Sequence, residues 1–143
     1  MSVIGRFIIW PAYAQIQIRD TADAEFPQWE TGEEPVVANA QCIGVATRGD
    51  EEGDVTVEVR RGPGERVEPD QWRLIFEGEL LLTGEHAIVG SYLGSDEHLV
   101  RLGRGWHPLR ILAKPKDARP SEFIVVFDWV PSATNSPPNQ KPP

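Results

Sequence analysis

The 143-residue sequence predicts an all-β protein, built as a single antiparallel β-sandwich of jelly-roll type. Short runs of alternating apolar and polar residues recur along the chain, and no segment keeps the 3.6-residue apolar period of an amphipathic helix. The 13 glycines and 13 prolines are about 18% of the chain, against about 12% in an average protein. So many helix-breaking residues exclude a bundle of long helices.

Four strands are predicted in the first half of the chain, at residues 7–10, 14–19, 41–47 and 54–60. The last is the clearest, because Val55, Val57 and Val59 fall on one face and polar residues fall on the other. Residues 21–39 are acidic, contain two prolines and show no alternation. We therefore expect a long loop there, with at most one helical turn.

Six further strands are predicted in the second half, at residues 72–77, 79–83, 87–92, 98–102, 106–113 and 123–130. The turn at residues 83–86 indicates a hairpin. Pro108 favours a strand end or an edge position, because proline cannot donate to the hydrogen-bond ladder. Residues 123–130 form the most apolar run and indicate a central strand that is buried on both faces. A total of about eight to ten short strands is typical of a sandwich.

Residues 1–130 are expected to form one β-sandwich domain, since single domains cluster around 100–150 residues. Residues 131–143 contain five prolines with Ser, Asn and Gln, which predicts a disordered tail. The single cysteine, Cys42, excludes an intramolecular disulfide. No apolar run is long enough for a signal peptide or a membrane span, so we expect a cytoplasmic protein that does not contact a membrane.

The charge distribution is the most informative functional feature. The chain has a net charge of −8, which disfavours direct nucleic-acid binding because such binding needs a basic surface. Between residues 20 and 54, ten carboxylates accompany a single cation, Arg48, whereas the rest of the chain has a net charge of +1. These acids form either a solubilising surface or an electronegative patch that docks a basic protein such as a nuclease. The candidate partner-binding residues are Asp20, Asp23, Glu25, Trp29, Glu30, Glu33, Glu34, Asp50, Glu51, Glu52 and Asp54.

Metal and catalytic sites are alternative hypotheses for other polar residues. Residues 50–54 offer hard oxygen ligands of the kind calcium prefers, but without the spacing of a calcium loop. His86, His98 and His107 lie near predicted strand ends and could meet in a metal-dependent hydrolase, although their spacing matches no zinc motif. Cys42 lies within a predicted strand and is expected to be a small buried residue. With no complete catalytic signature, we assign no catalytic residue, metal or cofactor.

The five tryptophans leave open a carbohydrate-binding or other small-molecule-binding module. Trp72, Trp106 and Trp129 lie in or beside apolar strands and are expected in the core or at its edge. Trp10 and Trp29 flank loops, so they are the better candidates for exposed platforms.

Several local features recur in a known family. They are an aromatic residue before a glutamine-containing strand, a tryptophan and a glycine in an acidic loop, and later strands joined by a glycine turn. They lie at residues 13–18, Trp29, Gly32, 41–47, 55–57, 100–102 and 106–112. In these features, which span residues 7–130, the chain resembles the competence protein J-like family of small bacterial β-sandwich proteins.

The resemblance implies a non-catalytic protein that binds and restrains a DNA-degrading nuclease, with no catalytic residues to carry over. The charge count independently indicates a basic partner. Together they predict a non-enzymatic acidic binding protein, an inhibitor or immunity-type partner of a nuclease. The chain departs from the family pattern in the turn at residues 60–64 and in its long tail, so the partner need not be the same.

Overall fold

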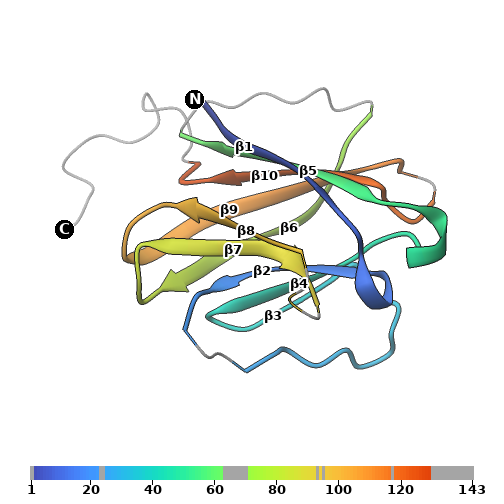
Figure 1. Cartoon of the computed structure of the whole chain (residues 1–143), viewed down its shortest axis with the longest axis horizontal. Helices are drawn as coiled ribbons and strands as arrows, with labels where there is room; N and C mark the ends of the chain where they lie inside the picture. Colours follow the sequence, from blue (N-terminus) through green and yellow to red (C-terminus); the bar gives the residue numbers. More distant parts are fainter. Residues whose placement is uncertain are drawn as a thin grey trace.

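A computed structural model describes residues 2–22, 25–62, 71–92, 94, 96–116 and 118–129. Within these residues, ten strands form two five-stranded sheets that pack face to face (Figure 1). Sheet A contains, in spatial order, β1 (Ser2–Ile9), β5 (Val55–Arg61), β10 (Glu122–Phe127), β9 (Gly105–Lys114) and β6 (Arg73–Leu82). Sheet B contains β3 (Val36–Ala38), β4 (Cys42–Ala46), β2 (Gln15–Asp20), β7 (His86–Ser91) and β8 (Glu97–Arg101). The predicted all-β sandwich is confirmed.

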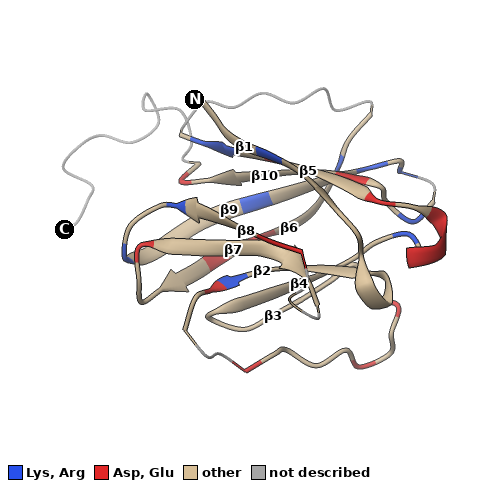
Figure 2. Cartoon of the chain, viewed as in Figure 1, with Lys and Arg blue, Asp and Glu red and all other residues tan. Residues whose placement is uncertain are grey.

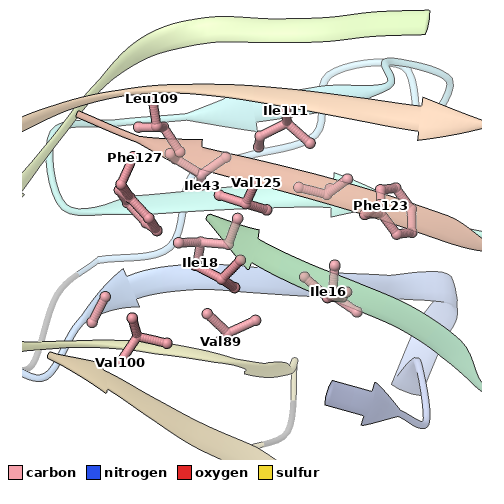
Figure 3. Close-up of a cluster of buried hydrophobic side chains, with 14 of the residues drawn as sticks. Ile16, Ile18, Ile43, Val89, Val100, Leu109, Ile111, Phe123, Val125 and Phe127 are labelled. Carbon is pink, nitrogen blue, oxygen red and sulfur yellow. The ribbon is translucent and has the colours of Figure 1, made fainter. Parts of the chain in front are cut away.

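The core lies between the two sheets and is filled by alternate residues of their strands. Val55, Val57 and Val59 are fully buried, as their alternation predicts. Phe123 and Phe127 of β10 meet isoleucines of sheet B in the same cluster (Figure 3). Burying each such side chain contributes about 1.5–3 kcal/mol, so this apolar layer supplies the main driving force for folding.

β10 is the central strand of sheet A, as the apolar run predicts. It pairs with β9 in the antiparallel sense and with β5 in the parallel sense. Both faces of β10 are covered, because Val125 points into the core whereas Ile124 and Val126 on the opposite face are also buried. One parallel pair therefore interrupts an otherwise antiparallel sandwich, a detail that strand periodicity does not encode.

β6 is a single strand, whereas the sequence predicts two strands separated at Gly78. Pairing with β9 continues without interruption through Gly78, which lies opposite Leu109, and the register shift of this strand lies earlier, between Leu74 and Phe76. The Phe76 ring lies over Gly78, where a Cβ atom would be 2.7 Å from Cζ of Phe76. The glycine thus admits an aromatic ring within the strand and does not end it.

Two further differences concern loops and proline. The predicted loop at residues 21–39 contains the short edge strand β3, which has too few residues to give a clear alternation. Pro108 lies inside β9, between β10 and β6, and not at an edge. Its carbonyl accepts a hydrogen bond from the Asp128 N–H at 2.6 Å, just beyond the end of β10. Pro108 has no N–H to donate, but the regular pairing of β9 with β10 has already ended at this point, so no hydrogen bond of that pairing is lost.

η1 (Ala12–Ala14) and η2 (Asp50–Glu52) are short 3₁₀ helices in the connections. No helix among the described residues is long and apolar enough to cross a membrane. The predicted tail at residues 131–143 and the proposed domain boundary at residue 130 lie outside the described residues.

Candidate functional site

Asp20, a predicted member of the acidic patch, is a buried structural residue. Its side chain has no exposed surface. Oδ2 accepts hydrogen bonds from Thr83 N–H at 3.1 Å, Thr83 Oγ1 at 2.6 Å and Gln41 Nε2 at 2.9 Å, and Oδ1 accepts one from the Thr21 N–H at 2.9 Å. Burial alone would raise the pKa of Asp20, but these hydrogen bonds outweigh it and lower the pKa. Asp20 therefore offers no accessible surface to a docked partner, in contrast to its predicted place in the acidic patch.

Glu34 organises the turn that contains it. Its carboxylate accepts hydrogen bonds from the N–H groups of Glu30 at 2.8 Å and Gly32 at 3.0 Å, and from Thr31 Oγ1 at 3.1 Å. The backbone N–H groups of Glu34 itself, Glu30 and Thr31 hold the pKa of the Glu34 carboxyl at about 2. Glu34 therefore keeps its negative charge across the physiological range while serving its own loop.

Four acids lie together at one end of the sandwich, and we name Asp50, Glu51, Glu52 and Asp54 the η2 cluster. Asp50 is half-buried and the other three are exposed. They form no ion pair within the described part of the chain. Only Glu52 uses its carboxylate locally, accepting the Gly49 N–H at 2.8 Å. The loop is fixed from both sides, because Trp10 Nε1 donates to the Asp50 carbonyl at 3.2 Å and Arg48 donates to the Asp54 carbonyl at 2.5 Å. The η2 cluster is thus a preformed group of carboxylates on an ordered turn (Figure 2).

Basic side chains separate the η2 cluster from the turn at residues 30–34. A groove of about 790 Å³ is lined by Glu33 and Glu34 together with Arg73, Lys116 and Arg119. A neighbouring hollow of about 350 Å³ is lined by Glu52, Arg48 and Arg119. The acids that are near one another in sequence therefore do not form one continuous surface. Apart from Arg48, the cations come from β6 and from the segment before β10, which a charge count over residues 20–54 does not include.

The remaining predicted residues follow the loop outside sheet B. Glu25, Glu30 and Glu33 are exposed. Trp29 is half-buried and lies over Gly44 of β4, where a Cβ atom would be 3.3 Å from its Cζ2. Asp23 lies outside the described residues.

The three histidines occupy separate environments. His107 is buried, donates from Nε2 to the Gly103 carbonyl at 2.8 Å and lies 2.9 Å from Asp128 Oδ1. His98 stacks on Phe7 with a centroid distance of 4.5 Å. Among the residues that the structure describes, no group of three or more His, Cys, Asp and Glu side chains could hold a metal ion. The described histidines thus lend no support to the hydrolase alternative that His86, His98 and His107 suggested.

Cys42 and the tryptophans also have defined positions. Cys42 is buried, and burial raises the pKa of its thiol to about 11, so the thiolate is not available as a nucleophile. Trp106 is 55% exposed, contrary to the core position that the sequence suggests, because His107 takes the inward position on β9. Trp129 and Trp72 are half-buried and lie beneath Arg110 and Lys114, respectively. Trp10 is exposed, as predicted.

The fold defines the class of protein, a sandwich of two five-stranded sheets. Neither a family model nor a curated protein matches the sequence. Among solved structures, the chain is similar to ComJ from Bacillus subtilis, described as an inhibitor of the DNA-degrading activity of NucA. The TM-score is 0.71 at 14% identity, over 88% of this chain and 96% of ComJ. The predicted ComJ-like fold is confirmed.

A second similar structure is that of the crocagin biosynthetic gene J product. It has a TM-score of 0.49 and 11% identity, over 92% of this chain and 97% of that chain.

Proposed function

We propose that this chain is a non-enzymatic protein that binds a basic partner, a DNA-degrading nuclease in the first place, through the η2 cluster. The carrying observation is that Asp50, Glu51 and Asp54 have neither an ion pair nor a side-chain hydrogen bond in the described structure, although their backbone is held by Trp10 and Arg48. Charges fixed in place and left unneutralised are suited to a partner of opposite sign. The ComJ-like fold supports the same class of partner, since ComJ inhibits a nuclease.

A nuclease grips phosphate groups with cationic side chains, so its own surface attracts carboxylates. Exposed carboxylates on a rigid turn would occupy that surface in place of the DNA backbone. The basic residues Arg48 and Arg119 beside the cluster restrict the approach, because a cationic partner that covered them would meet like charges. The η2 cluster, rather than the whole acidic stretch, is therefore the proposed contact.

The test is capture of the partner from a lysate of the source organism on the immobilised chain, at low and at high salt. The fraction that salt releases is assayed for DNA degradation with and without added free chain. We expect the fraction to degrade DNA and the free chain to suppress that activity. Retention should weaken with salt, because the Debye length falls from about 10 Å at 0.1 M to about 3 Å at 1 M.

A matched pair of variants distinguishes binding through the η2 cluster from attraction by the overall negative charge of the chain. Asp50→Asn, Glu51→Gln and Asp54→Asn together remove three charges and disturb no side-chain hydrogen bond that the structure describes. The control variant Glu25→Gln, Glu33→Gln and Glu79→Gln removes three exposed charges elsewhere. Equal recovery of nuclease activity on both variants, or no nuclease activity in the eluate, would refute the proposal.

A further inference from the structure

On the outer face of sheet B, a glutamine is flanked by a glycine on each neighbouring strand, and we call this part of the face the floor. Gln17 on β2 lies directly opposite Gly44 of β4 on one side and Gly90 of β7 on the other. Because both opposite residues are glycines, neither places a side chain directly beside Gln17. Trp29 and Val37 take the space above Gly44, and Asp96 and Glu97 take the space above Gly90, so groups from other segments surround Gln17.

Gln17 is nevertheless only 2% exposed, and its Oε1 atom has no hydrogen-bond partner among the residues that the structure describes. Four other buried polar atoms in the described chain lack a partner, but three of them belong to arginines that bond through other nitrogens, and the fourth is the ring nitrogen of Trp129. An unpaired buried amide costs stability, because it has lost its water and gained nothing in exchange. Such a group is uncommon in native proteins, so it marks a position where a bound molecule could supply the hydrogen bond.

Aromatic side chains enclose this position. A cavity of about 290 Å³ is lined by Gln17, by Gln15 and Gly44 of the floor, by residues 26–29 and by Tyr92. Phe26 and Tyr92 lie with their ring centroids 5.5 Å apart. The loop that supplies Trp29 runs along the outside of sheet B (Figure 1). We name this cavity the Gln17 pocket.

The lining determines the chemical class of the ligand. None of the residues around the Gln17 pocket carries a charge, so the ligand is neutral. The three glutamine amides each offer donors and an acceptor, which match adjacent hydroxyl groups that both donate and accept. The aromatic rings offer flat apolar surfaces against which a C–H face can pack. The volume is at the lower limit of known ligand sites, which suits one small ring.

We propose that the Gln17 pocket binds a neutral sugar residue, with the Gln17 amide bonded to its hydroxyls and its ring against Trp29 or Tyr92. A nucleotide would fit the aromatic rings, but its phosphate would find no cation among the residues that line the pocket. The pocket shares no residue with the η2 cluster. Sugar binding and partner binding are therefore separate properties that can be tested separately.

The experiment follows the side-chain amide of Gln17 and the indole N–H of Trp29 by NMR, using the full chain. The probes are millimolar maltose, cellobiose, lactose and chitobiose, with adenosine as a neutral aromatic comparison. We expect at least one disaccharide to shift both resonances in a saturable way. Absence of a shift with all four sugars, or a shift with adenosine alone, would overturn the assignment.

Gln17→Met keeps the side-chain length and removes the amide. It should weaken sugar binding about tenfold or more while raising the thermal midpoint, because a buried unpaired group is removed. Gln71→Met makes the same change at an exposed position and should alter neither property. Gly44→Ala places a methyl group 3.3 Å from Trp29 and should also weaken binding, which keeps the test valid if Gln17→Met does not fold. Unchanged affinity in both pocket variants would refute the proposal.

Discussion

Asp20 and the η2 cluster belong to the same acidic stretch of sequence, yet the structure uses them in opposite ways. Asp20 is buried and accepts four hydrogen bonds from three residues. Within the described part of the chain, the side chains of Asp50, Glu51 and Asp54 have neither a hydrogen bond nor an ion pair. Glu34 lies between these extremes, half-buried and hydrogen-bonded to the backbone of its own turn. Whether a carboxylate is structural or free to bind a partner therefore depends on the number of hydrogen-bond donors around it. Its position in an acidic stretch of sequence does not decide this.

The largest expected effect follows from removing Asp20. Asp20→Ala should lower the free energy of unfolding by about 3 kcal/mol, because it leaves Thr83, Gln41 and Thr21 donors without a partner. Urea denaturation measures this. Asp54→Ala is the control and should change little. A loss below about 1 kcal/mol for Asp20→Ala would contradict the structural role of this network.

The pH dependence of stability gives a second, smaller effect. The pKa of Asp20 is lowered in the folded state. Its contribution is therefore fully present above the unfolded value of about 3.9, and it is lost as pH falls through the folded pKa. The difference in unfolding free energy between the wild type and Asp20→Asn should be constant above about pH 5 and narrow below about pH 4. A difference that stays constant to lower pH would show that the charge of Asp20 does not matter.

Glu34 should give a local effect. Glu34→Ala removes the acceptor of the N–H groups of Glu30 and Gly32, so the turn should loosen while the sandwich stays intact. In the wild type, the amide shifts of Thr31 and Gly32 should titrate with the Glu34 pKa of about 2. NMR titration measures both. An apparent pKa near 4.3, the ordinary value for glutamate, would contradict the described hydrogen bonds.

The smallest stability effect is expected for the η2 cluster. Asp50→Asn, Glu51→Gln and Asp54→Asn together should change the free energy of unfolding by no more than about 0.5 kcal/mol, in the direction of a gain, because like charges repel. The same variant should associate with a basic partner about 10- to 1,000-fold more slowly at low salt and lose most of its salt dependence. Stopped-flow association measures the rates. Equal rates for variant and wild type would assign the cluster to solubility alone.

Much of the fold could be predicted because strand alternation is local. The inward faces of β5 and β10 follow directly from valine and phenylalanine positions. The parallel pairing of β5 with β10 could not be predicted, because it depends on which distant strand completes the sheet. The sequence predicts a break in β6 at Gly78, because sequence alone does not distinguish a glycine that makes room for an aromatic ring from one that ends a strand.

The site was predicted less well, and the physical reason is similar. The charge count over residues 20–54 predicts one acidic patch, but it cannot include Arg73, Lys116 and Arg119, which folding brings beside those acids. The sequence pattern does not indicate that Gln17 is buried, because a glutamine on the polar face of a strand is ordinarily exposed to water. Only the glycine opposite it on each side and the loop above it make it a buried polar group.

The position of β10 has a consequence for synthesis. Before residues 122–127 leave the ribosome, sheet A can exist only as two separate pairs, β1 with β5 and β9 with β6. Each pair then presents an unpaired strand edge, carrying residues such as Val57 and Ile111, that the central strand will later cover. Closing this gap pairs Thr56 with Glu122, and four strands, β6 to β9, lie between them in the sequence. Such a long-range pairing makes the step slow and places it late. Until β10 is in place, these unpaired strand edges are open to pairing with other chains.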